Sequence, residues 1–294
     1  MAFIDKVRAW WRTASMLEAL IAINVVVFVV LRLIMTAQLL FNVPGDGLMR
    51  WVELPSQPST LLSRPWTVIT YMFAHVDFLH ILFNMLWFYW LGRIFMDYFH
   101  PKQLASLYVM GGLGGAALYL LAYNLLPVFS HQPSFLLGAS ASILAIVVAT
   151  AAYVPDYKIG LLFIGPVSLK WVAGITVLLD FLSIGSANSG GHIAHLGGAL
   201  MGLWFGLSIA RGTDITRPVT RLLDAIVTWW PPFRRRSATP GVGQPIAGNA
   251  YHGPLHSTVS ERELDEILAK ITRSGYASLT AHERDVLNRA SRNR

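Results

Sequence analysis

Long apolar segments separated by short polar connections occupy the first two thirds of the chain. Six of them have the composition of transmembrane helices, and they cover residues 16–35, 78–95, 104–126, 136–153, 167–184 and 192–210. A helix needs about 20 mainly apolar residues to cross the hydrocarbon core of a bilayer. The pattern therefore predicts an all-α polytopic membrane protein, built as a six-transmembrane-helix bundle.

The apolar character ends near Arg211, and this change divides the chain. We predict a cytoplasmic interfacial segment at residues 1–15, which contains an amphipathic helix from Phe3 to Arg12. A membrane domain at 16–210, a basic linker rich in proline and glycine at 211–258, and a small helical hairpin at 259–294 follow.

The hairpin is predicted from two capping boxes, in which a hydroxyl residue and a glutamate bond each other's backbone N–H groups. Ser260 with Glu263 begins the first helix, and Thr280 with Glu283 begins the second. Gly275 fits the turn between them.

Composition supports a membrane protein, because only 13% of the residues are charged and a soluble domain carries about a quarter. The absence of cysteine excludes disulfides and thiolate metal sites. The net charge of +7 could indicate nucleic-acid binding, but the basic residues flank apolar segments, where they set topology. We therefore expect contact with membrane lipid and not with nucleic acid.

The distribution of lysine and arginine predicts the orientation. Basic residues precede the first apolar segment, follow the sixth, and occupy the second-to-third and fourth-to-fifth connections; those at 127–134 and 185–191 have none. Positively charged connections are cytoplasmic, so both termini are expected in the cytoplasm.

In this orientation the second, fourth and sixth segments all run inward from the outer side. The polar residues near their starts, His80, Asn84, Ser140 and His195, then lie at similar depth. Polar groups inside a bilayer are costly and usually face a protein interior or a wet cavity. Four of them from three helices predict one shared site.

Ser140 lies among small residues, in the sequence Leu-Gly-Ala-Ser-Ala-Ser at 137–142. Small residues permit a tight turn, and the free N–H groups of a helix start can stabilise an anion. A nucleophilic serine needs both features. Small residues and serines also pack helices together, which is the alternative interpretation.

His195 is a candidate general base, since imidazole titrates near neutrality; a purely structural, hydrogen-bonded histidine is the alternative. Gly198, Gly202 and Gly206 follow it at intervals of four. Such a stripe allows close helix approach. If the fourth segment is the partner, His195 reaches Ser140, although the stripe alone is equally consistent with helix packing or dimerisation.

His80 and Asn84 share one helix face, and both can donate hydrogen bonds to an oxyanion or to another helix. His75, His80, His192 and His195 could together bind a metal, but we expect no carboxylate at matching depth, and the sequence has no close ligand motif. We therefore expect no metal site. Neither a metal nor a cofactor is predicted.

These motifs resemble those of rhomboid intramembrane proteases. Residues 73–87, from Phe73 to Trp87, resemble the second span of that family. Gly138-Ala139-Ser140 resembles its nucleophile motif. Ala194-His195, together with Gly198 and Gly202, resembles its catalytic-histidine helix. The resemblance covers residues 16 to 210.

The resemblance implies a serine endopeptidase with a Ser140–His195 dyad and no cofactor. His80, Asn84 and the backbone N–H of Ser140 would hold the oxyanion. The substrates would be single-span membrane proteins cut near the outer leaflet, and the expected location is a bacterial cytoplasmic (inner) membrane.

Two positions depart from the family pattern. Ala141 replaces the glycine that usually follows the nucleophile, and its methyl group could tighten the oxyanion pocket. Thr67 follows Trp66, so an arginine that anchors the first loop, residues 36–63, is expected to be missing. Asp180 lies near the outer end of the fifth segment and is a candidate third member of a catalytic triad. Because the family pattern uses no acid, we expect instead a structural or cavity-facing role for it.

Two other functions remain open from the sequence. A non-catalytic rhomboid-like protein would bind transmembrane helices but lack the nucleophile or base. A transporter or channel would place polar groups across the full membrane depth, whereas here they cluster on one side.

Overall fold

The computed structural model describes residues 3–43, 47–129, 132–161 and 164–229, together with Ile267, Lys270, Thr280, His282 and Glu283. The chain forms two compact units, Met1–Pro245 and Ile246–Arg294. In the second unit the backbone and side chains of Thr280 and Glu283 form the expected capping box, at 2.7 and 3.3 Å. Ser260, Glu263 and Gly275 lie outside the described residues.

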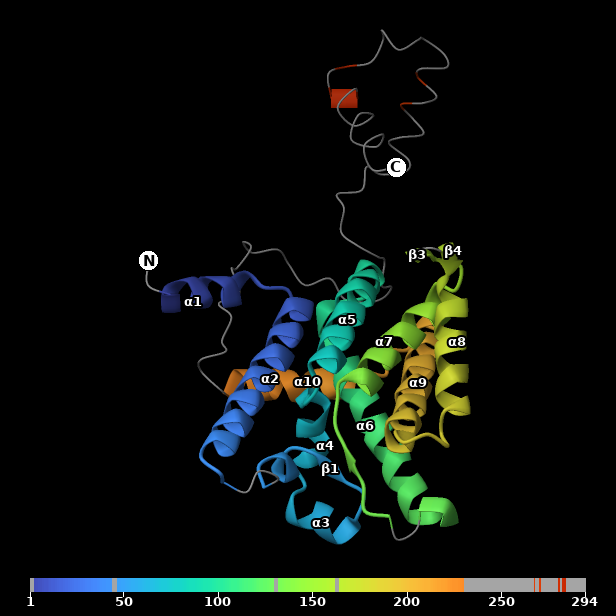
Figure 1. Cartoon of the computed structure of the whole chain (residues 1–294). Helices are drawn as coiled ribbons and strands as arrows, with labels where there is room; N and C mark the ends of the chain where they lie inside the picture. The colour runs from blue at the N-terminus through green and yellow to red at the C-terminus, as the bar shows by residue number, and fades with distance from the viewer. Residues whose placement is uncertain are drawn as a thin grey trace. The chain divides into compact units, whose positions relative to one another are not determined.

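A helix stands at each of the six positions predicted for transmembrane segments (Figure 1). They are α2 (Met16–Leu40), α5 (Phe78–Tyr98), α6 (Pro101–Leu125), α7 (Ser140–Tyr153), α8 (Leu169–Leu182) and α9 (Ser189–Ala210). Four of these, α2, α5, α6 and α9, are long and apolar enough to cross a membrane, and α7 is a shorter apolar helix. The chain is therefore a mostly helical, multi-pass membrane protein.

Helix α1 (Phe3–Thr13) occupies the position of the predicted amphipathic helix. Ser15 then caps α2 in a capping box with Glu18, whose carboxylate accepts from the Ser15 N–H at 2.6 Å. The short helices of the first loop and its continuation are η1 (Met49–Trp51), α3 (Pro58–Ser63), α4 (Thr67–Thr70) and η2 (Tyr71–Phe73); η3 (Pro127–Phe129) follows α6.

Two small antiparallel sheets, which the all-α prediction did not include, connect the helices. Strand β1 (Leu54–Pro55) pairs with β2 (Phe135–Leu136), and β3 (Lys158–Leu161) pairs with β4 (Gly165–Ser168). As a result, two predicted segments begin later than expected. Residues 136 and 167 lie in strands, and α7 and α8 start at Ser140 and Leu169.

Part of the predicted linker at 211–258 is helical. Helix α10 (Arg217–Trp229) packs against α6. Lys102 forms a salt bridge with Asp224 at 2.8 Å, and the hydroxyls of Ser106 and Thr220 share a 2.7 Å hydrogen bond. The boundary placed at residue 211 thus precedes a helix that contacts the membrane domain.

Helix α7 is the centre of the hydrophobic core. Eleven of its 14 residues are buried, and it contacts α5, α6, α8 and α9. Its closest partner is α9, because Gly198, Gly202 and Gly206 face the backbone carbonyls of Ala141, Ala145 and Ala149 respectively. A Cβ on any of these glycines would lie less than 3 Å from the carbonyl oxygen that the glycine faces. The glycine stripe therefore sets the distance between the two helices.

The first loop is held by arginines, contrary to our expectation. Arg64 Nη1 donates to the Arg50 carbonyl at 2.8 Å and its guanidinium covers the Trp51 ring, which stacks on Trp66 at 5.6 Å. Arg50 in turn lies 3.9 Å above the ring of Phe135. Although Thr67 follows Trp66, arginines at two other positions tie the loop to the strand that leads to Ser140.

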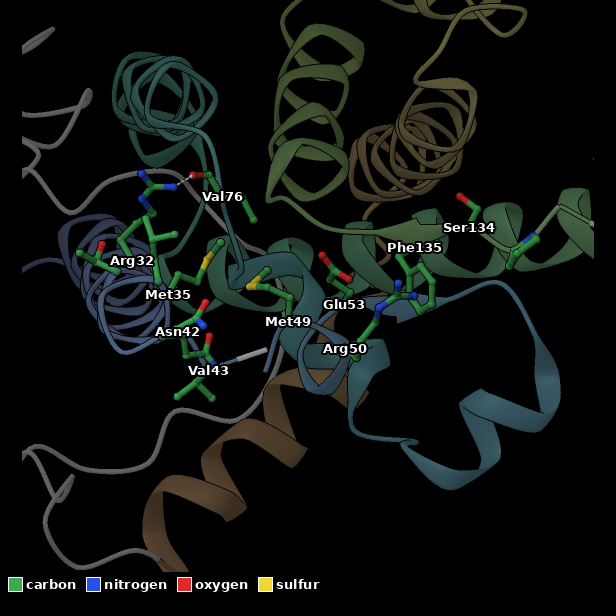
Figure 2. A pocket seen from close by; sticks show the side chains of 14 residues that line it. Arg32, Met35, Asn42, Val43, Met49, Arg50, Glu53, Val76, Ser134 and Phe135 are labelled. Carbon is green, nitrogen blue, oxygen red and sulfur yellow. Dashed lines mark hydrogen bonds between the residues drawn. The ribbon is translucent and has the colours of Figure 1, made fainter. Parts of the chain in front are cut away.

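A pocket of about 840 Å³ opens between the end of α2 and this loop (Figure 2). Arg32 lines one side and donates to the Val76 carbonyl at 3.4 Å, while Arg50 and Glu53 line the other. None of the four predicted site residues, His80, Asn84, Ser140 and His195, is among its lining residues.

Candidate functional site

Ser140 and His195 lie in hydrogen-bond contact, although 55 positions separate them in the chain. The Oγ atom of Ser140 is 2.6 Å from Nε2 of His195. Ser140 is the first residue of α7, and His195 lies two turns into α9. Neither side chain is fully buried. A hydroxyl this close to an imidazole nitrogen can transfer its proton during attack on a carbonyl.

The turn before Ser140 depends on Gly138. Its φ of +120° is unfavourable for other residues, and its N–H donates to the Tyr71 carbonyl at 2.9 Å. This conformation ends β2 and places Ser140 at the start of α7. No side chain of the described residues caps this helix start, so its first N–H groups are free to face an anion.

His195 is held from its other side by Asp180. The Nδ1 atom of His195 lies 2.8 Å from Oδ1 of Asp180, and Nδ1 of His192 lies 2.8 Å from the same oxygen. Asp180 is buried near the end of α8. This contact between a carboxylate and the candidate base corresponds to the triad alternative, which we did not expect from the sequence. The signal for it was an acidic residue at the outer end of an apolar segment, which is rare without a partner.

His80 lies beside the turn that carries the serine. A Cβ added to Gly138 would lie 2.9 Å from Cε1 of His80 and 3.8 Å from Oγ of Ser140. The structure therefore brings His80 next to the nucleophile candidate. Asp77 caps α5 by accepting from the His80 N–H at 2.8 Å, which fixes the start of this helix.

Asn84, one turn after His80 on α5, and His75 contact each other beside the turn that carries Ser140. Asn84 Nδ2 donates to the His80 carbonyl at 3.0 Å and lies 3.4 Å from His75 Nε2. The Ala139 N–H also points to His75 Nε2, at 3.4 Å. Burial, with a smaller effect of His80, lowers the pKa of His75 to about 4, against the opposing effect of the Phe73 backbone. His75 is therefore neutral, and Nε2 accepts hydrogen bonds.

His75 was not among the residues predicted to form the site around Ser140. Its ring is completely buried and contacts the backbone directly before Ser140 as well as the Asn84 amide. One lone pair thus faces two donors at long distance, so neither contact is strong. One N–H of the Asn84 amide is therefore only weakly hydrogen-bonded and can donate to a better acceptor.

The methyl group of Ala141 points toward α6. A Cβ on Gly115 would lie 2.8 Å from the Cβ of Ala141, and Ala141 is buried. The extra methyl, compared with the glycine of the family pattern, therefore fills a space opposite a glycine on the neighbouring helix.

Asp180, His192 and His195 could hold a metal ion, because their ligand atoms lie within 4.8 Å of one another. We expected no carboxylate at the depth of these histidines, and the position of Asp180 beside His192 and His195 shows that this expectation was wrong. The 2.8 Å separations are those of hydrogen bonds, which account for the cluster without an ion.

Comparison with known proteins supports the family suggested by the motifs. Residues 62–212, just over half of the chain, match the Rhomboid domain family, and residues 258–293 match a family of unknown function (DUF6576). The chain is similar to the mitochondrial RHOMBOID-like protein 12 of Arabidopsis thaliana, with 34% identity over 46% of this chain and 44% of that protein.

Two further relatives come from a fish and a bacterium. The mitochondrial Presenilin-associated rhomboid-like protein A of Danio rerio is 27% identical over 58% of this chain and 43% of that protein. The Rhomboid protease GlpG of Serratia proteamaculans is 29% identical over 45% of this chain and 59% of that protein. The chain matches about half the length of these relatives. With the ordered motifs and the fold, the domain match shows that the chain belongs to the rhomboid family.

Proposed function

We propose that this protein is an intramembrane serine endopeptidase that cuts other membrane proteins, with Ser140 as nucleophile and His195 as general base. The observation that carries the proposal is the 2.6 Å contact between Ser140 Oγ and His195 Nε2. Rhomboid relatives of this chain include a named protease. The non-catalytic alternative would lack one of these two groups.

In the proposed reaction, Ser140 Oγ attacks the carbonyl carbon of the scissile peptide bond while its proton passes to His195 Nε2. A tetrahedral intermediate forms. His195 then gives the proton to the leaving amine as the C–N bond breaks, and an acyl ester remains on Ser140. Water, activated by the same imidazole, hydrolyses the ester and restores the serine.

The negative charge on the intermediate needs donors. The backbone N–H of Ser140 at the uncapped start of α7 is the first candidate. His80 beside Gly138 is the second. Asn84 is the third, because its 3.4 Å contact with His75 is long enough to be exchanged for a bond to the oxyanion.

The proposed topology has six membrane helices with both termini in the cytoplasm of a bacterial cell. Helices α7 and α8, of 14 residues each, measure about 21 Å and therefore do not fill a hydrocarbon core of about 30 Å. The start of α7 can therefore lie below the outer membrane surface, where water can enter the site. We expect single-span membrane proteins as substrates, cut near the outer leaflet.

The orientation can be measured directly, because the chain contains no cysteine. Single replacements Lys158→Cys and Gln132→Cys should react with a membrane-impermeant maleimide from opposite sides. Labelling of Lys158→Cys from inside the cell and of Gln132→Cys from outside is expected. The reverse pattern contradicts the topology.

We also propose the predicted division of the chain. The membrane domain covers residues 16–210, the segment 211–258 follows it, and the helical tail covers residues 259–294. The described tail residues include a salt bridge between Lys270 and Glu283 at 2.8 Å. This contact and the capping hydrogen bonds from Thr280 lower the pKa of Glu283 to about 2, so the carboxylate stays charged at physiological pH.

The protease proposal is tested by incubating purified protein in detergent with a panel of single-span substrates and resolving the products on gels. Cleavage by the wild type and its loss in Ser140→Ala are expected. Ser142→Ala is the matched control, since it removes a second hydroxyl one half-turn along α7. Cleavage that survives in Ser140→Ala, or that is absent from the wild type with every substrate, contradicts the proposal.

A further inference from the structure

Four side chains form one continuous hydrogen-bonded chain across three helices. Ser140 on α7 contacts Nε2 of His195 on α9, and Nδ1 of the same ring contacts Oδ1 of Asp180 on α8. His192, one turn earlier on α9, meets that oxygen at the same distance of 2.8 Å. The base is thus held at both ring nitrogens.

The carboxylate determines which nitrogen of His195 carries the proton. A neutral imidazole has one N–H donor and one acceptor nitrogen. An ionised carboxylate can only accept hydrogen bonds, so Nδ1 of His195 must be the donor. Nε2 then presents its lone pair to the hydroxyl of Ser140, and this is the tautomer that a general base requires.

The setting of Asp180 favours such a fixed arrangement. The residue is only 7% exposed, and its Oδ1 has two imidazole donors. Hydrogen bonds to a charged acceptor are stronger than those between neutral groups. Both imidazoles reach the same oxygen, Oδ1, and their rings lie edge to face with centroids 6.0 Å apart.

We propose that Asp180 is a positioning residue for the Ser140–His195 pair, which makes the site a serine–histidine–aspartate triad with His192 as a second donor to the carboxylate. This inference rests on the proposed function. During attack by Ser140, the imidazolium that forms on His195 stays hydrogen-bonded to the Asp180 carboxylate, which remains ionised and takes no proton.

A purely structural role for Asp180 predicts a different outcome. The same hydrogen bonds join α8 to α9, so their loss in that case would lower stability and disturb the site as a whole. A positioning role predicts a loss confined to the chemical step. The two roles separate when kcat, KM and unfolding temperature are measured on the same variants.

The experiment compares full-length wild type, Asp180→Asn and Asp180→Glu in detergent with one cleavable substrate. Asp156→Asn is the matched control, because it removes an acid from an exposed salt bridge with Lys170. For Asp180→Asn we expect kcat to fall at least tenfold and up to about 10⁴-fold, the effect of a wrong imidazole tautomer in a triad. KM and the unfolding temperature should stay close to the wild type.

Partial recovery of kcat in Asp180→Glu, which keeps the carboxylate, supports the inference. Equal kcat in wild type and Asp180→Asn overturns it, as does a loss that appears in KM and unfolding temperature with kcat unchanged. Loss of wild-type cleavage on chelation, restored by Zn²⁺, overturns it in favour of a metal site at these residues. An inactive wild type whose Ser140 takes no fluorophosphonate means instead that the proposed function has failed.

A second measurement does not depend on activity or on a variant at Asp180. In ¹⁵N-histidine NMR spectra of the wild type, His195 is assigned by the signals that disappear in His195→Gln. A proton on Nδ1 of the neutral ring is expected, with Nε2 unprotonated. A neutral ring that carries its proton on Nε2 overturns the inference.

Discussion

Gly198 faces the carbonyl oxygen of Ala141 so closely that a single added carbon would overlap it. This contact joins the residue after the candidate nucleophile to the helix that carries His195. Two further glycines repeat it along α9, against Ala145 and Ala149. The separation of α7 and α9, and with it the reach of His195 to Ser140, is therefore set by residues without side chains.

The first prediction concerns this helix contact. Gly202→Ala places a methyl group against the Ala145 carbonyl, and we expect a loss of about 1–3 kcal/mol in the free energy of unfolding, as for overpacked cores. Cleavage should fall as well, because α7 and α9 must move apart. Denaturant unfolding in mixed micelles measures the first effect and a substrate gel the second.

Gly174→Ala is the control for that variant. Gly174 lies within α8, and a Cβ there would have no atom within 4 Å apart from its chain neighbours and the backbone of its own helix. Its stability should equal or slightly exceed that of the wild type. A Gly202→Ala protein as stable and active as Gly174→Ala would show that α9 does not need its glycines for packing.

The second prediction concerns the turn before the serine. Gly138→Ala forces a side chain into a positive-φ conformation and toward Cε1 of His80 at 2.9 Å. We expect cleavage to fall at least tenfold, since misplacement of about 1 Å costs about 10²-fold. Gly165→Ala has comparable backbone strain at φ +90° with open space around it, and it should cleave normally. Equal activity of the two variants argues against the role assigned to the turn.

The third prediction concerns Asn84. If its amide holds the oxyanion, Asn84→Ala should lower kcat by about one to three orders of magnitude, the effect of removing one such donor. KM should change little, because the interaction forms in the transition state. Asn124→Ala removes a matched amide whose bonds go to the Ser56 and Leu120 carbonyls. An unchanged kcat in Asn84→Ala would make Asn84 a structural residue.

The helices were predictable because their signal is local. Continuous apolar runs indicated all six, and the spacing of the glycines at 198, 202 and 206 indicated the close contact of α9 with a neighbour. The start of α7 was placed at residue 136 instead of 140, because Leu136 and Leu137 are as apolar as a helix requires. Only the conformation of Gly138 and the pairing of β2 with β1 exclude them.

The missed features all depend on distant partners. Leu54 and Leu136 pair across 82 positions in strands of two residues, too short for an alternating pattern. Helix α10 is amphipathic and polar, so its composition resembles that of a linker. Only its contacts with α6 distinguish it from one. The link from Asp180 to His195 required the relative rotation of α8 and α9, which composition and spacing do not determine.

The Ser140–His195 dyad is tested by reaction of the purified protein with a fluorophosphonate, followed by mass spectrometry of the labelled peptide. Because His195 Nε2 lies 2.6 Å from Ser140 Oγ, we expect modification of Ser140 in the wild type and strong suppression in His195→Ala. Labelling of Ser140 at the same rate in His195→Ala, or labelling of a different serine, would contradict it.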